Sequence, residues 1–326
     1  MHLPGGTRDE SLHGGDVVTD KLHDHVAHSV HDRLLHLATT RKEDFNAILV
    51  RYGNERLLYR LSRTRHGKQF ILKGAALFVL WLGRVHRPTR DLDLLATGRI
   101  DKSVLTAVFQ DICTVPVRPD GLRFDPASIA ITEIREGQTY HGLRVKLRGF
   151  LGTARLNLQV DIGLGDSLSQ KAEEVAYPTL LDMPAPHVKV YPRETAIAEK
   201  LDAMLERGIK NSRMKDYFDI AMLARHFAFD GNTLQIAINA TLKRRGRVLP
   251  DHLPSSLTDE FGKDATKVLQ WKAFIRNNRS GEDSSDLLTT VRQVRIFLEP
   301  VLIAINTRTA FDGHWPPAGP WGKRNA

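Results

Sequence analysis

Apolar residues follow two different periods along the chain. Three runs, residues 129–134, 143–147 and 156–162, alternate apolar and polar positions and are separated by glycine-containing turns. A period of two is typical of strands with one buried face, so we predict an antiparallel meander. Before these runs, residues 30–52 carry apolar side chains at helical spacing, and the helical spacing returns from Glu194 onward. The pattern therefore predicts helices, then a sheet, then a mainly helical half.

Segments without periodicity mark the expected boundaries between these parts. Residues 1–24 are rich in Gly, His and Asp, which predicts a disordered tail. Residues 163–192 contain Gly163 and a group of prolines ending at Pro192, which predicts a linker. We expect a sheet-containing core with N-terminal helices over residues 25–185, a helical domain over residues 186–310 and a second tail over residues 311–326.

The first candidate for chemistry is a turn between a short buried strand and a helix. Residues 69–72 read as the strand, Lys73-Gly74 as the turn, and a helical run follows from Leu77. Glycine lets a phosphate approach the backbone, and the amides of a starting helix attract the phosphate charge. The same dipeptide also occurs in ordinary tight turns. It predicts a phosphate-binding turn only together with a second feature nearby.

That second feature is a set of aspartates on predicted strands. Asp91 and Asp93 flank Leu92, so an extended backbone places both carboxylates on one face. Asp161 lies on the polar face of the 156–162 strand. Carboxylates from neighbouring strands can hold one Mg²⁺ ion or a pair of them in a two-metal site. The alternative is that these aspartates are solvated residues of strand faces.

The helical half carries a third group of candidates. Lys200 lies beside an apolar helix stripe, where an ammonium group needs an anion: a carboxylate in an ion pair, or the phosphates of a nucleotide. Asp216 lies on the stripe of the next helix, and Asp219 is within one turn of it. Either acid is a partner for Lys200.

Together these motifs resemble the nucleotidyltransferase toxins of the AbiEii/AbiGii family, which includes the MenT enzymes of type IV-style toxin–antitoxin systems. The resemblance runs from about Phe70 to about Leu223. It rests on the Lys73-Gly74 turn, Thr-x-Asp-x-Asp-Leu at residues 89–94, Glu-Thr-x-x-Ala-x-Lys at residues 194–200 and Arg-x-Lys-Asp-Tyr-x-Asp at residues 213–219. It implies an α+β fold, in which a polymerase-β-like mixed sheet with flanking helices is followed by a mainly helical C-terminal half.

The resemblance also implies a role for each matching residue. Metal would be bound by Asp91, Asp93 and Asp161, and the catalytic set would add Lys200 and its partner Asp216. Nucleotide contacts would come from Lys73, Gly74, Thr89 and Lys200. Many relatives carry a serine in the glycine turn, whereas this chain has Ala75 and Ala76. The contacts to the triphosphate must therefore differ in this turn, although the backbone amides remain.

Net charge bears on the partner of such an enzyme. The chain carries 47 Lys and Arg against 38 Asp and Glu, a formal charge of +9. An excess of this kind favours a polyanion, and nucleic acid is the natural candidate, although basic residues also keep surfaces soluble. The family resemblance makes RNA, in particular tRNA, the favoured polyanion. Two basic clusters could contact RNA. They comprise Arg207, Lys210 and Arg213 in one segment and Lys243, Arg244 and Arg245 in the other.

Composition also limits the location of the protein. No run is long and apolar enough to span a bilayer, and the N-terminus lacks a signal-peptide pattern, so we expect no membrane association and a cytoplasmic protein. Cys113 is the single cysteine, which excludes an internal disulfide.

We therefore expect a Mg²⁺-dependent toxin that transfers NMP from an NTP to RNA, with the tRNA 3′ end as the favoured acceptor. Two alternatives stay open: AMP or UMP transfer to a protein, and nucleic-acid binding without catalysis. A toxin of this type would need a cognate antitoxin or a modification to restrain it. Phosphorylation of Thr89, two residues before Asp91, would place negative charge beside the metal site.

Overall fold

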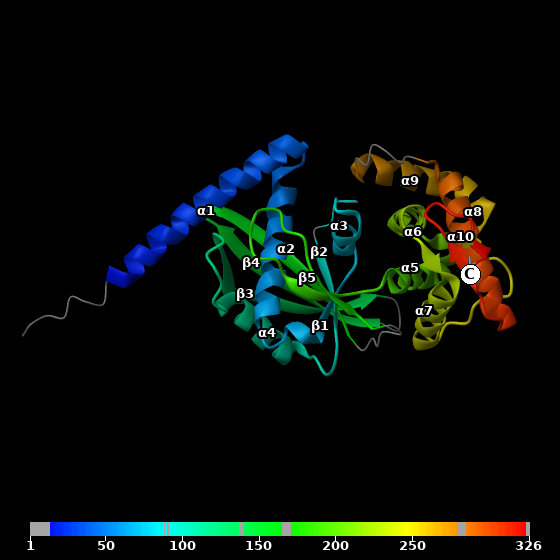
Figure 1. Ribbon diagram of the computed structural model, residues 1–326, viewed down its shortest axis with the longest axis horizontal. Coiled ribbons are helices and arrows are strands. Elements are labelled where there is room, and N and C mark those ends of the chain that lie inside the picture. Colours follow the sequence, from blue (N-terminus) through cyan, green and yellow to red (C-terminus); the bar gives the residue numbers. More distant parts are fainter. Residues whose placement is uncertain are drawn as a thin grey trace, which may run out of the picture.

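The computed structural model describes residues 14–85, 87, 89, 91–136, 140–164, 171–278 and 285–323. It consists of two parts that lie side by side, a sheet with its helices and a bundle of helices (Figure 1). Each part has its own hydrophobic core. Phe78 of the sheet-containing half packs into the core of the helical half, so the two parts share a packed boundary.

A mixed sheet of seven strands forms the first part, in the order β3-β4-β5-β2-β1-β7-β6. The β2–β5 and β1–β7 pairs are parallel, and the remaining pairs are antiparallel. The strands are β1 (Phe70–Lys73), β2 (Asp91–Ala96), β3 (Leu122–Glu136), β4 (Tyr140–Leu151), β5 (Ala154–Gly163), β6 (Glu173–Ala176) and β7 (His187–Val190).

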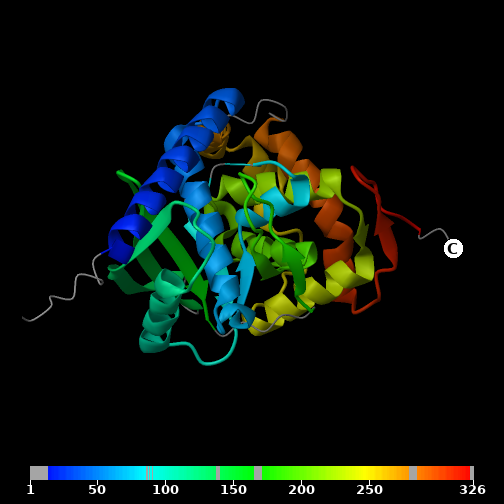
Figure 2. The ribbon, with the colours of Figure 1, turned by 60° about the vertical axis from the view of Figure 1, so that its left-hand side comes forward.

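One face of the sheet is covered by helices (Figure 2). These helices are α1 (Gly14–Arg41), α2 (Phe45–Arg63) and α4 (Lys102–Thr114), and α3 (Ala76–Leu82) follows β1 directly. The apolar positions of β2 and β5 alternate with half-buried or exposed polar ones, as expected for strands with one face in the core. Helix α2 approaches β5 so closely that a Cβ atom on Gly53 would lie 2.9 Å from a methyl group of Leu158. The opposite face of β2 and β5 carries the aspartates.

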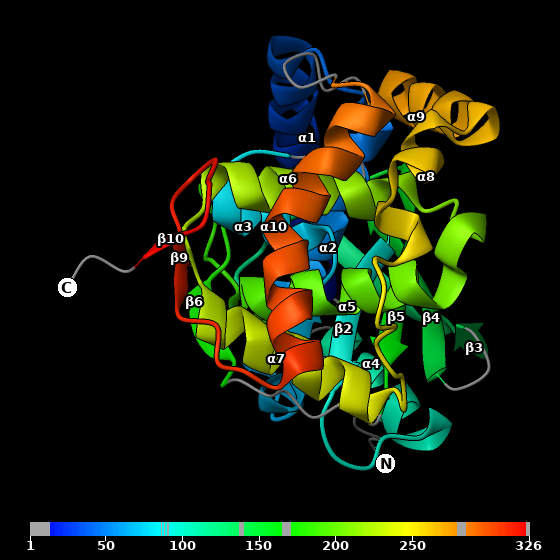
Figure 3. The same ribbon diagram turned by 90° about the vertical axis from the view of Figure 1, so that its right-hand side faces the viewer.

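The second part is a bundle of helices, most of which pack against α10 (Figure 3). Its core contains the apolar stripes of α5, α6, α7 and α10. The elements are α5 (Arg193–Arg207), α6 (Met214–His226), α7 (Gly231–Arg244), α8 (Asp259–Lys263), α9 (Ala265–Asn278) and α10 (Leu287–Thr307), with the short strands β8 (Phe229–Asp230), β9 (Gly313–Trp315) and β10 (Gly322–Lys323). The described residues also form the 3₁₀ turns η1 (Gly67–Gln69), η2 (Gly208–Lys210) and η3 (Ser255–Leu257).

The α+β architecture and the meander of β3, β4 and β5 confirm the expectation from the hydrophobic pattern. Asp101 caps α4, since its side chain accepts a hydrogen bond from the backbone N–H of Val104.

The segment predicted as a linker, residues 163–192, differs from the expectation. It contains β6 and β7, and β7 pairs with β1, so the sheet extends past the predicted boundary at residue 185. Both strands have only four residues, too short to show a period clearly. The side chains of Val188, Val190 and Tyr191 belong to the core around the sheet.

The predicted tails also differ. Helix α1 begins at Gly14, inside the segment expected to be disordered, and residues 1–13 lie outside the described residues. At the other end, β9 and β10 pack on the helical half. The indole N–H of Trp315 donates to the carbonyl of Ala224 at 2.6 Å, and that of Trp321 donates to the carbonyl of Phe297 at 2.8 Å. Aromatic packing orders this segment despite its prolines and glycines.

Among the described residues, none of the helices has the length and hydrophobicity that a membrane crossing requires.

Candidate active site

The turn after β1 is built against the acidic strand β2. Lys73, the last residue of β1, is the register partner of Asp93. Gly74 follows with a φ of +73°, a conformation that glycine adopts without strain. A Cβ atom at Gly74 would lie 2.0 Å from Oδ2 of Asp93, so no other residue fits. Glycine is therefore required here both for the backbone conformation and for the close approach of the Asp93 carboxylate.

The predicted aspartates lie on one face of two neighbouring strands. Asp91 and Asp93 share the half-buried face of β2, and Asp161 is the register partner of Asp93 on β5. Burial raises the pKa of Asp93 to about 6, and repulsion from Asp161 and Asp91 adds to the rise while Lys73 opposes it. A carboxylate buried among like charges is stabilised by a bound cation.

The geometry around Asp161 bears on which carboxylates of this face can bind a metal ion. Arg144 on β4 donates through Nε to Oδ1 of Asp161 at 2.8 Å and through Nη2 to Oδ2 at 2.7 Å. Within the described residues, no group of three or more Asp, Glu, His or Cys side chains is gathered in a metal-binding arrangement. Asp91 and Asp93 fit a divalent cation by their shared face and by the repulsion at Asp93. Asp161, the third carboxylate of the predicted set, is paired with Arg144 in this structure.

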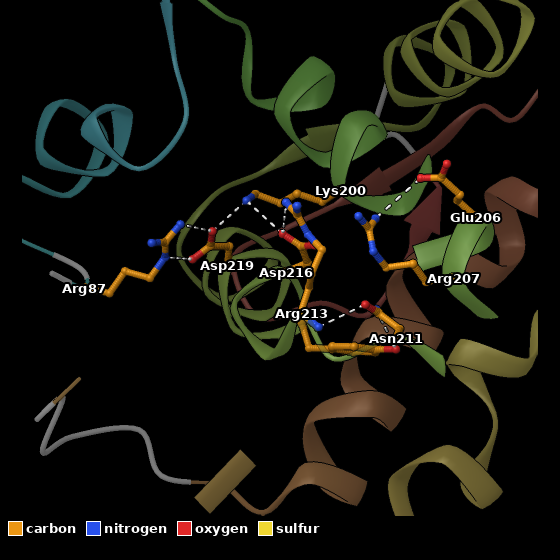
Figure 4. Close-up of polar contacts among 9 residues, drawn as sticks. Arg87, Lys200, Glu206, Arg207, Asn211, Arg213, Asp216 and Asp219 are labelled. Atoms are coloured by element: carbon orange, nitrogen blue, oxygen red, sulfur yellow. Dashed lines mark hydrogen bonds and ion pairs between the residues drawn. The ribbon is translucent and has the colours of Figure 1, made fainter. Parts of the chain in front are cut away.

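Lys200 of α5 lies between two acids of α6 (Figure 4). Its Nζ atom is 2.6 Å from Oδ2 of Asp219 and 3.6 Å from Oδ1 of Asp216. Both predicted partners therefore contact Lys200, and the alternative, Asp219, is the closer one. Both aspartates are fully buried, so each needs a cation.

Two arginines complete this network from either side. Arg87, from the loop before β2, donates through Nε and Nη2 to the two oxygens of Asp219 at 3.0 and 3.1 Å. Arg213 donates through Nε to Asp216 at 2.6 Å. Burial alone would lower the pKa of Arg87, but the Asp219 carboxylate raises it above its ordinary value. The Arg87–Asp219 pair joins the loop before the acidic strand to the helical half.

Positive charge exceeds negative charge in this network. Lys215 lies next to Asp216 on α6 and makes no hydrogen bond or close ion pair with other described residues. Burial lowers the pKa of Lys215, and the neighbouring cations Arg213 and Arg87 lower it further, while Asp216 only partly compensates. A cation placed among other cations favours an anionic ligand.

Glu199 connects the glycine turn to the helical half. Its carboxylate lies 3.4 Å from Nζ of Lys73 and accepts a hydrogen bond from the hydroxyl of Tyr191 at 3.1 Å. Burial acts to raise the pKa of Glu199, but the charges of Lys73, Arg244 and Arg245 outweigh burial and lower it. Lys73 is thus held between Asp93 on one side and Glu199 on the other.

These groups meet in a cavity of about 160 Å³ between the two halves. Among the described residues that line it, seven are basic and four are acidic, so this part of the wall carries an excess of positive charge. The basic residues are Lys73, Arg87, Lys200, Arg207, Arg213, Lys215 and Arg245, and the acidic ones are Asp93, Glu199, Asp202 and Glu206. Gly74 and Ala75 form part of the same wall.

Several predicted residues lie in this cavity and others do not. Asp91, Asp161, Asp216 and Thr89 are not part of the lining, although the first three lie within electrostatic reach of residues that are. The Thr89 hydroxyl donates to the backbone carbonyl of Asp91 at 3.2 Å.

The residues predicted to contact RNA divide into two groups. Arg207, Arg213 and Arg245 line the cavity, whereas Lys210 and Lys243 are exposed outside it. Arg244 is turned toward Glu199, with Nη2 3.9 Å from its carboxylate. The two basic clusters therefore do not form a single exposed surface, because part of each faces inward to the buried acids.

Four contributors were not identified from the sequence: Arg87, Arg144, Glu199 and Lys215. Lys215 and Glu199 are the immediate neighbours of the predicted Asp216 and Lys200, so the motifs themselves contained a signal. Arg144 could have been found from the turn at residues 152–153. Pairing β4 with β5 around this turn places Arg144 opposite Asp161. Arg87 gave no comparable signal.

A glycine turn, carboxylates on adjacent strands and a cation-lined cavity are the features of an enzyme that handles phosphate groups. The chain is matched over residues 56–296 by the model of a family described as nucleotidyl transferase AbiEii toxin, type IV TA system. The protein belongs to this family and is a nucleotidyltransferase. Membership implies a nucleotide substrate and a cognate antitoxin.

Comparison with solved structures gives two distant similarities. One is a candidate nucleotidyltransferase from H. pylori, with 17% sequence identity and a TM-score of 0.44, covering 79% of this chain and 97% of its own. The other is JHP933 from Helicobacter pylori, with 17% identity and a TM-score of 0.42, covering 78% of this chain and 90% of its own. No curated protein matches the chain significantly.

Proposed function

We propose that this nucleotidyltransferase depends on Mg²⁺ and transfers NMP from an NTP to an RNA acceptor, with the 3′ end of a tRNA favoured and pyrophosphate released. The observation that carries the proposal is the cavity. It brings Gly74 and Asp93 of the sheet together with Lys200 and Lys215 of the helical half. One wall offers a backbone turn and a carboxylate, and the other offers cations.

The residues of the chain have distinct roles in this proposal. Asp91 and Asp93 would hold the cation, whose chemistry when bound is to reduce the charge on the phosphates and to activate a hydroxyl. Lys73 and Gly74 would contact phosphate oxygens from the sheet side. Lys200 would contact them from the helical side, since Asp216 and Asp219 hold its ammonium group in place.

An RNA acceptor is supported by the charge of the chain and by the cavity lining. The formal charge is +9, and Arg207, Arg213 and Arg245 lie at the cavity wall where an acceptor phosphate would approach. Lys210 and Lys243 are exposed outside the cavity and would contact the RNA further from the reacting hydroxyl.

Transfer is tested by incubating the purified protein with Mg²⁺, each α-³²P-labelled NTP in turn and total tRNA. Asp91→Ala and Lys200→Ala serve as variants, and EDTA removes the metal. Label in RNA that is lost in both variants and in EDTA supports the proposal and identifies the nucleotide. Label in protein instead of RNA would mean that the acceptor is a protein. If no NTP is transferred by folded protein free of antitoxin, the proposed reaction is wrong.

Regulation through Thr89 is part of the same proposal. Its hydroxyl contacts the backbone of Asp91, so a phosphate there would add negative charge at the start of the acidic strand. Thr89→Glu should lower transfer strongly, and Thr89→Val should lower it little. A Thr89→Glu variant with full activity would argue against this mode of control.

A further inference from the structure

The third aspartate of the acidic face is engaged by an arginine of the neighbouring strand. Arg144 on β4 and Asp161 on β5 are register partners. The guanidinium donates to both carboxylate oxygens, at 2.8 and 2.7 Å, and Gln159 donates to Oδ1 at 3.4 Å. This two-point geometry is the strong form of an arginine–carboxylate contact.

This ion pair lies where it affects cation binding by the other two aspartates. Asp161 is the register partner of Asp93, and its charge reaches Asp93. A guanidinium bound to Asp161 neutralises the charge that would attract a divalent cation to this carboxylate, and it repels a cation placed nearby. Arg144 and the cation therefore compete for one carboxylate.

The pair is also able to open. The Arg144 side chain is 33% exposed and the Asp161 side chain is 18% exposed. The guanidinium can move into solvent without disturbing the core, because the apolar residues of β4 and β5 face the other side of the sheet. The contrast is Arg60–Asp120 in the same half, where both side chains are buried.

We propose that Arg144 is a positioning residue that competes with the divalent cation for Asp161. In the absence of nucleotide, Arg144 neutralises Asp161 and leaves Asp91 and Asp93 as the carboxylates that hold the cation. Asp161 joins them only when the guanidinium moves away. The inference rests on the proposed function, because it assumes that the acidic face holds a metal ion.

The test measures Mn²⁺ binding to the full chain without nucleotide, from the EPR signal of free Mn²⁺ during titration. The variants are Arg144→Met, Asp161→Asn and the two combined. Competition predicts that Arg144→Met binds Mn²⁺ about tenfold more tightly than wild type. Asp161→Asn should change the affinity little in the wild-type background, and should abolish the gain in the Arg144→Met background.

A matched control is available on the same strand. Arg148 on β4 pairs with Asp125 at 3.0 Å, and its side chain is about as exposed as that of Arg144. Arg148→Met therefore removes an equivalent charge that is not paired with Asp161. It should leave Mn²⁺ affinity within about twofold of wild type. Far-UV circular dichroism and thermal unfolding verify that every variant is folded.

The outcomes separate this inference from the proposed reaction. If Arg144→Met binds Mn²⁺ no more tightly than wild type while wild type does bind it, Arg144 is only a structural partner and the inference is wrong. An equal effect of Asp161→Asn in both backgrounds would also overturn it. If no variant binds Mn²⁺, the assignment of the metal to this face fails as well. NMP transfer by wild type, measured separately, tests the reaction itself.

Discussion

Two clusters of charged side chains in this protein differ in how completely they are neutralised. Arg60 and Asp120 form a two-point ion pair at 2.7 and 2.9 Å, and backbone groups of Leu122 complete their hydrogen bonds. At the cavity, Asp216 and Asp219 are shared among Lys200, Arg87 and Arg213, and Lys215 adds a further cation. The first cluster is balanced within the chain, whereas the second keeps a positive excess.

The difference indicates what each cluster is for. Removing one partner of a balanced buried pair is strongly destabilising, because the other charge is left buried and uncompensated. A cluster with excess charge is unfavourable by itself and becomes favourable when an anion binds. The first is therefore a structural element of the sheet half, and the second is the binding site. Substitutions in the two clusters should have opposite effects on folding and function.

The largest effect is expected for Lys200→Met. This substitution removes the cation held by both buried aspartates and should lower single-turnover NMP transfer by about 10³-fold, as expected for one preorganised charged group. Lys263→Met, an exposed lysine of α8, is the control and should transfer at the wild-type rate. Retention of more than a tenth of the rate by Lys200→Met would remove Lys200 from the proposed mechanism.

Arg60→Met tests the balanced cluster. It leaves Asp120 buried without its guanidinium partner and should lower the free energy of unfolding by about 3–5 kcal/mol. Urea unfolding measures the loss. The fraction that remains folded should transfer NMP at the wild-type rate, because Arg60 is not part of the cavity. If Arg60→Met loses little stability, the Arg60–Asp120 pair is not the structural element that its geometry indicates.

Lys215→Met tests the excess charge directly. Nucleotide affinity, measured by calorimetry without RNA, should fall about tenfold, which corresponds to about 1.4 kcal/mol. Thermal stability should stay unchanged or rise, because burial and nearby cations disfavour the charge of Lys215. Lys210→Met, an exposed residue outside the cavity, is the matched control and should bind nucleotide normally. A loss of stability in Lys215→Met would contradict a binding role.

The smallest effect concerns Asp93 and pH. Because the pKa of Asp93 is raised from 3.8 to about 6, the folded chain keeps a proton that the unfolded chain releases between these values. The contribution of Asp93 to stability therefore falls as pH rises through this window and stays low above it. In EDTA, Asp93→Asn should be more stable than wild type at pH 7.5, where the unfavourable charge of Asp93 is present, and no more stable at pH 4.

Urea unfolding at the two pH values measures this gain, with Asp312→Asn, an exposed residue, as the control. The same Asp93→Asn variant should lose NMP transfer. If Asp93→Asn is more stable than wild type but does not transfer NMP, Asp93 serves function at the expense of stability. Equal stability of Asp93→Asn and wild type at pH 7.5 would mean that the environment of Asp93 does not disfavour its charge.

The sequence by itself determined which faces carry the chemistry. The alternation of apolar and polar positions placed Asp91 and Asp93 on one face of β2 and Asp161 on the polar face of β5. Helical spacing placed Lys200 beside the buried stripe of α5. The motifs also identified the family correctly. These properties are local, because the periods of a strand and of a helix are set by a few consecutive residues.

Only the tertiary structure decided which charges meet. Arg87 contacts Asp219 across 132 residues of chain, and Lys73 contacts Glu199 across 126. The strand register brings Arg144 to Asp161, and the packing of the two halves makes Asp219 the closest partner of Lys200. Such contacts depend on how distant segments pack. A residue pattern that covers one turn or one strand contains no information about them, so the balance of charge in the cavity follows from the fold alone.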